Sequence, residues 1–182
     1  MPEFLNIVDE EDSIIGQEER TKIHAEGLLH REIHVYFVTT NKEIIFQHRA
    51  RDKDTFPDLL DATVGGHVEI GDGYEKTAIK ETDEETGVKI KESDLVLISK
   101  SANRIEDETT KKINYAFLSA YLYAYNGSID NLVIETGKAI GFEIWTIDKL
   151  LNINDEDKKR FIPFVLDFTT TKLIPFIKNL KL

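Results

Sequence analysis

The sequence contains no cysteine among its 182 residues. Disulfide bonds, thiolate metal ligands and cysteine nucleophiles are therefore excluded. Positive charge is also scarce, because 23 lysine and arginine residues face 34 acidic ones and give a formal net charge of −11. A chain this acidic is a poor match for a nucleic-acid polymer, so we expect no such partner. A small diphosphate stays compatible, since a local pair of cations and a bound metal can neutralise it.

Long apolar runs are absent as well. No run approaches the ~18–20 residues of a membrane-spanning helix, so we expect no membrane partner. No basic segment followed by an apolar one opens the sequence, and we expect a cytoplasmic protein without a signal peptide. The sequence shows no internal repeat and no long linker. With 41% hydrophobic residues, we expect one domain over residues 1–182.

The chain does contain short β-rich runs on both sides of one strongly helical segment. Residues 33–39 and 44–48 meet at Asn41-Lys42, which predicts a hairpin. Residues 113–125 carry apolar side chains on both faces, which is typical of a central strand. Further strands are predicted at 4–8, 62–64, 95–101 and 142–146, and helices at 18–25, 74–86, 147–151 and, interrupted by Pro163 and Pro175, 155–182. This order predicts a sheet between helices, with a short N-terminal β extension and a C-terminal helical segment.

The most informative segment runs from Gly66 to Val88 and reads GHVEIGDGYEKTAIKETDEETGV. Glu81, Glu84 and Glu85 lie at i, i+3 and i+4, a spacing that gathers side chains on one side of a helix. Like charges placed this way repel each other and weaken the helix. A divalent cation held by oxygen ligands turns the same cluster into a binding site, and Mg²⁺ and Mn²⁺ suit such ligands.

The alternative is a solvated acidic face, and helical periodicity tests it. At ~100° per residue, Glu85 lies within ~40° of Glu81, in the sector of Tyr74, whereas Lys76 and Lys80 lie on the far side, at roughly 200–260°. A solvated patch belongs on the side of the lysines. The glutamates are therefore predicted to face partly inward, where carboxylates need partners. This geometry favours the metal site.

The segment resembles the Nudix box, which is glycine, five residues, glutamate, seven residues and then Arg-Glu-U-x-Glu-Glu-x-Gly-U, with U a bulky aliphatic residue. In this alignment Gly66 is the first glycine, and Glu81, Glu84 and Glu85 are the box glutamates. The resemblance implies a Nudix fold, an α/β (α+β) architecture with a mixed β-sheet sandwiched between α-helices. It also implies a Mg²⁺- or Mn²⁺-dependent hydrolase in which these glutamates bind the metal and take part in catalysis.

Three positions depart from the box. Asp72 replaces a glutamate, Lys80 replaces the arginine, and Thr82 replaces an aliphatic residue. The first two keep their charge but lose reach or the planar guanidinium fork. In addition, Ala139 stands where many relatives have a glutamate, and Glu135 and Glu143 are the nearest acids. These departures leave open a non-catalytic, Nudix-like ligand-binding module.

The flanking segment LLHREIHVYFVTTNKEIIFQHRARDKDTFPDLLDATVGGH resembles one branch of the family. That branch contains the type 1 isopentenyl-diphosphate isomerases and related hydrolases. By this resemblance, Arg49, Lys53, Gly66 and Glu69 are expected to contact the substrate. A solvated basic loop is the alternative for Arg49 and Lys53, and a polar loop residue is the alternative for Glu69. An isomerase is disfavoured, because Gly65 occupies the position of its cysteine.

Three histidines, His24, His30 and His67, resemble the metal-binding histidines of those isomerases. The further glutamate pair of that metal site is missing, because residues 112–114 include no acid. Glu106 and Glu108 have suitable spacing but need a shifted alignment, and we favour a bracing role for the histidines. The function implied is hydrolysis of a phosphoanhydride bond in a nucleoside diphosphate derivative or similar small diphosphate. The oligomeric state stays open, with a homodimer as one option.

Overall fold

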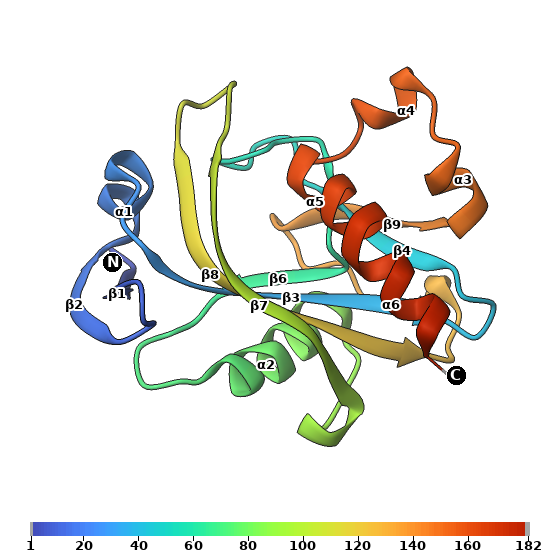
Figure 1. Cartoon of the computed structure of the whole chain (residues 1–182), viewed down its shortest axis with the longest axis horizontal. Helices are drawn as coiled ribbons and strands as arrows, with labels where there is room; N and C mark the ends of the chain where they lie inside the picture. Colours follow the sequence, from blue (N-terminus) through green and yellow to red (C-terminus); the bar gives the residue numbers. More distant parts are fainter. Residues whose placement is uncertain (1, 181–182) are drawn as a thin grey trace.

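A computed structural model describes residues 2–180 as a central β-sheet with one long helix on one face and the C-terminal helices on the other (Figure 1). The strands are β1 (Phe4–Val8), β2 (Ile14–Glu19), β3 (His30–Thr39), β4 (Ile44–Arg49), β5 (Leu60–Asp61), β6 (Val64–His67), β7 (Leu95–Glu106), β8 (Ile113–Tyr125) and β9 (Ala139–Trp145). The helices are α1 (Arg20–Glu26), α2 (Tyr74–Thr86), α3 (Ile147–Leu151), α4 (Asp155–Lys158), α5 (Pro163–Phe168) and α6 (Ile174–Asn179). Single turns of other helix types are η1 (Glu92–Asp94), η2 (Ile129–Asn131) and the π-helical η3 (Thr169–Leu173). Residues 181 and 182 of the predicted C-terminal helix lie outside the described residues.

A mixed seven-stranded sheet forms the centre of the structure. Its main order is β5-β4-β3-β8-β7, in which β3 and β8 are parallel and the other pairs are antiparallel. Strand β6 pairs with the first half of β3, and β9 pairs with β4. The place of β8 between β3 and β7 confirms the predicted central strand. The β1–β2 hairpin forms a separate sheet, which is the predicted N-terminal β extension.

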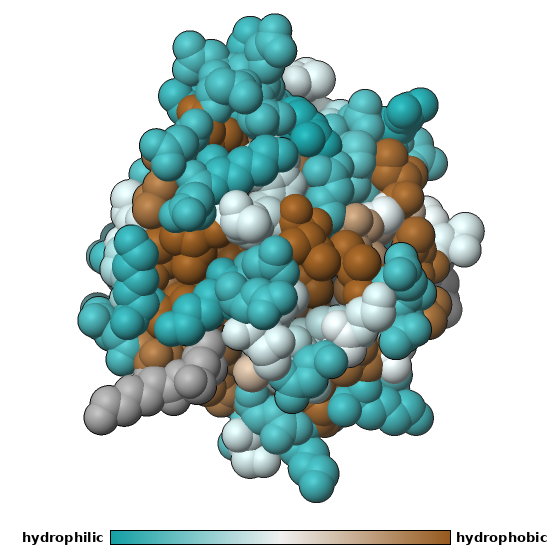
Figure 2. Space-filling view, turned by 90° about the vertical axis from the view of Figure 1, so that its right-hand side faces the viewer, coloured by the Kyte–Doolittle hydropathy of each residue, from teal (hydrophilic) through white to brown (hydrophobic). Residues whose placement is uncertain are grey.

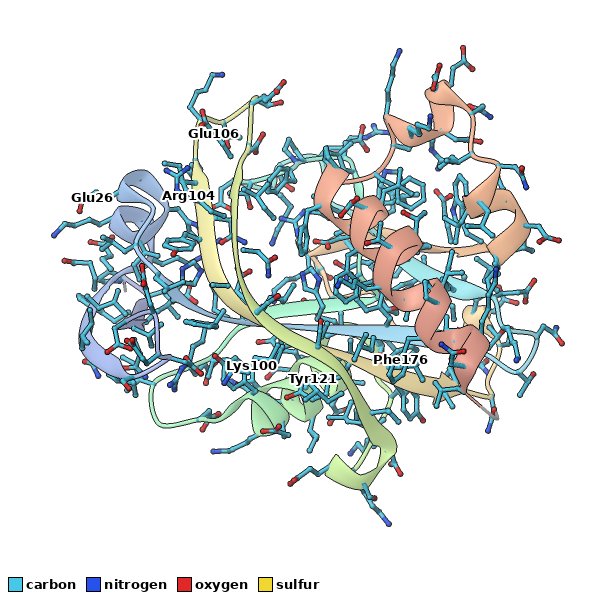
Figure 3. All side chains as sticks on the ribbon, in the orientation of Figure 1. Glu26, Lys100, Arg104, Glu106, Tyr121 and Phe176 are labelled. Carbon is cyan, nitrogen blue, oxygen red and sulfur yellow. The ribbon has the colours of Figure 1, made fainter. Side chains whose placement is uncertain are left out.

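Side chains that alternate along β3 give the sheet two buried apolar faces. Phe37 packs with Tyr74 and Tyr121 on the side of α2, whereas Tyr36 packs on the opposite side against the C-terminal helices that carry Phe176. Figure 3 shows Tyr121 on the side of α2 and Phe176 on the C-terminal helix. The prediction of an α+β fold with a mixed sheet between helices is confirmed.

The C-terminal segment corrects one part of the prediction. Pro163 opens α5 at its first turn, where the missing N–H would have had no helical partner. Pro175, in contrast, does not interrupt the helical run, which continues from 163 to 179. The π-helical turn η3 ends two residues before this proline and changes the hydrogen-bond spacing there. We attribute the continuity to that turn, because it relieves the usual clash of the ring with the preceding turn.

The double glycine is the second correction. The strand predicted at 62–64 lies at Val64–His67, so Gly65 and Gly66 are inside β6 instead of in a turn after it. The backbone of β3 provides the reason, because Ile33 pairs with Gly66 in an antiparallel ladder. Strand β6 thereby runs beside α2 and brings the two glycines next to the helix.

Within residues 2–180, every helix is too short or too polar to span a membrane. Figure 2 shows the side near α3 and α6, where apolar groups are separated by hydrophilic ones. No continuous apolar face is visible on this side of the molecule. The homodimer and the cytoplasmic location both stay predictions.

Candidate active site

Helix α2 carries the box glutamates and has the predicted boundaries. It runs over Tyr74–Thr86, and Gly87 ends it in the left-handed conformation at φ 71°. Glu81 and Glu85 are only 7% and 2% exposed, whereas Glu84 is exposed and does not line the cavity beside them. The inward orientation predicted for Glu81 and Glu85 is therefore confirmed.

Three donors surround the carboxylate of Glu85. The amide of Gln47 on β4 donates to Glu85 Oε2 at 2.9 Å, and the N–H of Gly65 donates to the same oxygen at 3.3 Å. The ammonium of Lys138 lies 3.2 Å from Glu85 Oε1 and 3.4 Å from Glu81 Oε2. One cation can therefore contact both carboxylates. The carboxylate oxygens of Glu81 and Glu85 are ligands that suit a hard divalent metal such as Mg²⁺ or Mn²⁺.

The raised pKa values of Glu81 and Glu85 indicate that this site has too little positive charge to keep both carboxylates ionised. Burial raises the pKa of Glu81, and it raises the pKa of Glu85 to about 7, although Lys138 opposes both shifts. Burial would lower the pKa of Lys138, but the charges of Glu85 and Glu81 outweigh burial and raise it. One ammonium does not fully stabilise two buried carboxylates, so a divalent cation would complete the neutralisation.

The raised pKa of Glu85 predicts that metal-induced stabilisation grows with pH. The folded-state pKa of about 7 exceeds the ordinary 4.5, so metal-free stability falls as pH rises from 4.5 through about 7. Metal ions bind the ionised carboxylates and offset this loss. We expect millimolar Mn²⁺ to raise the thermal midpoint by roughly 2–4 °C at about pH 8, for ~1 kcal/mol of stabilisation, and by far less at about pH 5.5. Equal shifts in thermal unfolding at the two pH values would contradict this explanation.

Gly66 leaves the space that Glu81 needs. A Cβ at this position would lie 2.6 Å from Glu81 Cδ and 2.9 Å from Glu81 Oε1. No side chain fits there unless Glu81 moves. We therefore expect Gly66→Ala to weaken Mn²⁺ binding by about 10–100-fold, the range seen when the support of a metal ligand is lost.

Gly65 is the matched control for this substitution, because it precedes Gly66 on the same strand. A Cβ at Gly65 would approach His34 at 3.4 Å, an ordinary contact distance. Calorimetric titration of Mn²⁺ should give near-native affinity for Gly65→Ala. Identical affinities for the two alanine variants would show that Glu81 is not a ligand held in place by this close approach.

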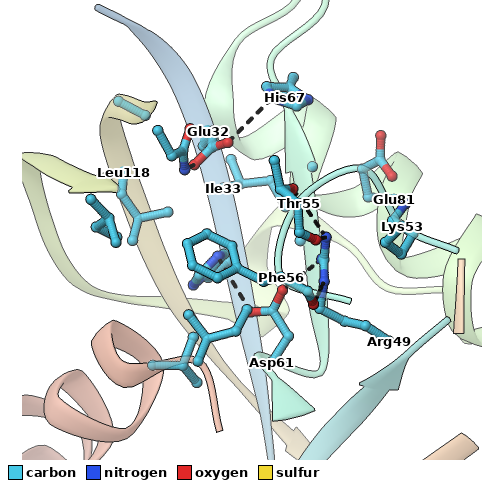
Figure 4. A pocket seen from close by; sticks show the side chains of 18 of the residues that line it. Glu32, Ile33, Arg49, Lys53, Thr55, Phe56, Asp61, His67, Glu81 and Leu118 are labelled. Atoms are coloured by element: carbon cyan, nitrogen blue, oxygen red, sulfur yellow. Dashed lines mark hydrogen bonds and ion pairs between the residues drawn. The ribbon is translucent and has the colours of Figure 1, made fainter. Parts of the chain in front are cut away.

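Arg49 is held by the protein itself. Its guanidinium donates to Asp61 Oδ2 at 2.9 Å and to the backbone oxygens of Thr55 at 2.8 Å and Phe56 at 3.1 Å (Figure 4). A phosphate contact by Arg49 would compete with these bonds. Lys53 lines the same cavity without an ion-pair partner within 4 Å in the described part of the chain, and burial lowers its pKa. The structure thus favours Lys53 over Arg49 as the cation available to a ligand.

The acids near the box fall into two groups. Glu69 is exposed at the rim of the cavity and pairs with the box residue Lys80. Glu135 reaches the site from the loop before β9, with Oε2 3.8 Å from the ammonium of Lys138. Glu143 instead accepts from the indole of Trp145 at 3.2 Å and pairs with an arginine outside the cavity. Of the two acids nearest position 139, the structure therefore places only Glu135 at the site.

A second polar cluster adjoins the cavity and consists of His24, His30, His67 and Glu32. His24 Nε2 lies 3.1 Å from His67 Nε2, and Glu32 Oε1 lies 3.2 Å from His67 Nε2 and 3.5 Å from His30 Nε2. Nδ1 of His24 and of His30 each face a backbone carbonyl, which makes Nδ1 the donor in a neutral ring. Burial, followed by the other two histidines, lowers the pKa of His24 to about 4. Nitrogen lone pairs and a carboxylate thus converge, a ligand set that can hold a divalent cation.

The acid of this cluster comes from an unexpected strand. Residues 112–114 supply no carboxylate, but Asn114 on β8 donates to Glu32 Oε2 at 2.8 Å and holds Glu32 of β3 in place. Glu106 ends β7 beside the turn of the β7–β8 hairpin (Figure 3). Both Glu106 and Glu108 are exposed. The histidines also connect α1 to β8, because His24 faces the carbonyl of Ile113, which agrees with the bracing role.

One cavity joins the two clusters. Its lining includes two of the box carboxylates, Glu81 and Glu85, together with Lys53 and Lys138. The cavity extends from there to Glu32 and His67 (Figure 4). Apolar side chains complete the lining and include Ile105, Leu118, Ile162, Phe164 and Val165. Sequence reasoning missed Lys138 and Gln47, because each lies on a different strand or loop and no spacing along the chain connects either with the box.

The NUDIX domain model matches residues 28–165, which include α2 and most of the cavity lining. An uncharacterised Nudix hydrolase of Clostridium acetobutylicum is 30% identical over 156 residues, which cover 84% of this chain and 74% of that protein. The chain therefore belongs to the Nudix family. With several further curated relatives, also uncharacterised Nudix hydrolases, the match spans about half of the relative's length, from 47% to 50%.

Solved structures share the fold. DR0079 of Deinococcus radiodurans gives a TM-score of 0.62 at 24% identity, covering 86% of this chain and 96% of that one. The Nudix domain of Shewanella oneidensis NrtR, in complex with ADP-ribose, gives 0.51 at 14% identity, covering 69% of this chain and 77% of that one. These likenesses show the fold alone. Family membership supports a hydrolase of the Nudix type.

Proposed function

We propose that this protein hydrolyses a phosphoanhydride bond in a nucleoside diphosphate derivative or similar small diphosphate, with Mg²⁺ or Mn²⁺ as cofactor. The observation that carries the proposal is the buried pair Glu81 and Glu85, whose two carboxylates share the single ammonium of Lys138 at the cavity wall. Glu84 on the exposed flank of the helix completes the box. A bound metal would neutralise charge on the diphosphate and lower the pKa of an attacking water.

The side chains of the cavity supply the proton acceptor and the phosphate-binding group. Glu85 accepts the proton of the attacking water, and the donors Gln47 and Gly65 fix one of its oxygens in place. Lys53 holds the leaving phosphate, since its ammonium faces the cavity without a protein partner in the described residues. Arg49 fixes the loop that carries Lys53, through its bonds to the 55–56 backbone.

The bond changes follow from this arrangement. Water oxygen forms a new P–O bond, the bridging P–O bond breaks, and the electrons of that bond go to the departing phosphate. The proton lost by water passes to Glu85 and from there to solvent or product. Gly66 leaves room for Glu81 and lines the cavity, where its backbone can contact the substrate, and Glu69 lies at the rim, where it can contact either metal or substrate. Two phosphorylated products result.

A substrate panel tests this function. ADP-ribose is the first compound, because it is the ligand of the Shewanella oneidensis domain. The similarity of the two folds does not identify the substrate of this protein. Nucleoside triphosphates, nucleotide sugars and isoprenoid diphosphates complete the panel, read by phosphate release before and after phosphatase treatment. We expect at least one compound to give phosphatase-sensitive products with Mg²⁺ and none with EDTA. Measurable ligand binding without turnover on any compound would instead indicate the binding module left open by Asp72, Lys80 and Ala139.

A further inference from the structure

We infer that Lys138 is a movable counter-cation of the Nudix box. In the metal-free protein it neutralises Glu81 and Glu85, and when a divalent metal binds there its ammonium transfers to the diphosphate of the substrate. This inference rests on the proposed function and adds to it a substrate-binding residue that lies outside the box and outside the residues predicted from the sequence.

In the first of these two states, Lys138 contacts both buried box carboxylates. Its Nζ lies 3.2 Å from Glu85, 3.4 Å from Glu81 and 3.8 Å from Glu135. Among residues 2–180, it is the one basic side chain within 4 Å of either buried box carboxylate. The ammonium therefore contacts one oxygen of each of the two buried residues that would hold the metal. A divalent ion held by Glu81 and Glu85 would repel this ammonium strongly, so we expect metal binding to displace Nζ.

The backbone around Lys138 is held firmly while its side chain is not. The carbonyl of Lys138 accepts from the N–H of Ala50 at 3.0 Å, and its N–H donates to the carbonyl of Glu135 at 3.1 Å. Gly137 at φ 82° provides the left-handed turn that this arrangement needs. The side chain is 33% exposed and has four rotatable bonds, so Nζ can move over several ångströms from a fixed base.

The second state follows from the neighbouring charges. Lys53 and Lys138 line the same cavity, and burial, followed by the charges of Arg49 and Lys138, lowers the pKa of Lys53. The two like charges therefore repel each other. An anion between Lys53 and Lys138 would remove this repulsion. A diphosphate bound to the metal brings such an anion to the place where the displaced ammonium needs a new partner.

Lys138→Met tests the inference, because the two states predict effects of opposite sign. Without the competing ammonium, Mn²⁺ alone should bind roughly fivefold more tightly, the lower range of coupling between two sites. With Mn²⁺ saturating, imidodiphosphate should bind about tenfold or more weakly, because a charge-assisted hydrogen bond is lost. Both affinities are measured by calorimetry at about pH 8.5, so that protons do not replace the removed cation on the carboxylates. Circular dichroism confirms that the variant is folded.

Lys112→Met is the matched control. Lys112 is 31% exposed and lies 3.3 Å from Asp54, so it has nearly the same exposure and ion-pair distance but does not contact the box. Neither affinity should change in this variant. Lys138→Arg provides the rescue, because it keeps the charge and should return both affinities towards those of the unmodified protein.

The outcomes separate the inference from the function on which it rests. If Lys138→Met leaves both affinities unchanged, or weakens both, Lys138 is a fixed brace and the inference is wrong while metal-dependent hydrolysis stands. If Lys138→Met does not fold, Lys138→Arg is compared with the unmodified protein instead. Loss of imidodiphosphate binding in this charge-conserving variant would then overturn the inference. If the unmodified protein binds no Mn²⁺, the proposed function and the inference both fail.

Discussion

Glu85→Gln is expected to reduce Mg²⁺-dependent turnover by about 10³-fold or more while leaving the fold intact. Glutamine keeps the shape of the side chain, but it neither accepts a proton from water nor gives the metal a negative ligand. The fold should tolerate the change because burial already favours the neutral carboxyl, as the pKa of about 7 shows. The measurements are kcat/KM on the best compound of the substrate panel and the thermal midpoint of unfolding. Glu84→Gln should also remove turnover.

Asp83→Asn is the control for these two substitutions. Asp83 precedes Glu84 on α2, is exposed and does not line the cavity of the box carboxylates. Removing its charge should alter kcat/KM by no more than about twofold, as for most surface changes. Unchanged turnover in both Glu84→Gln and Glu85→Gln would contradict the role assigned to the box.

Arg49→Met is expected to destabilise the protein by about 3–5 kcal/mol, the usual effect of removing one partner of a buried ion pair. Asp61, which is buried, would lose the guanidinium that lies 2.9 Å from its carboxylate. The backbone oxygens of Thr55 and Phe56 would lose their donor as well. The free energy of unfolding in urea measures this effect directly.

Arg51→Met is the matched control, two residues further along the chain. Its side chain is 79% exposed and makes only a long ion pair of 3.5 Å with Asp58. Its removal should change the free energy of unfolding by no more than about 0.5 kcal/mol. If Arg49→Met keeps full stability and raises only KM, then Arg49 is a free phosphate ligand, as the sequence alone suggested, and the bracing role described above is wrong.

The inward orientation of the box glutamates could be predicted from the sequence because it depends on one helix. The period of 3.6 residues places Glu81 and Glu85 with Tyr74, and the burial of all three confirms it. The central position of β8 was likewise predictable, since apolar residues on both faces of a strand require a covering layer on each.

The partners of those glutamates could not be predicted in the same way. Gln47 comes from β4 and Lys138 from the loop before β9, so their contacts with Glu85 exist only once the strands have assembled. Glu32 is a similar case, because it lies beside Asn114 only through the parallel pairing of β3 with β8. Tertiary pairing of this kind leaves no periodic pattern in a single sequence.

Direct calorimetric titration of Mn²⁺ into the purified protein, with and without imidodiphosphate, tests the metal site most directly. Two buried carboxylates that share one ammonium predict saturable uptake of the ion at up to millimolar levels, lost in Glu85→Gln. No uptake under either condition would contradict the metal-dependent mechanism and leave the Nudix fold as the part that stands.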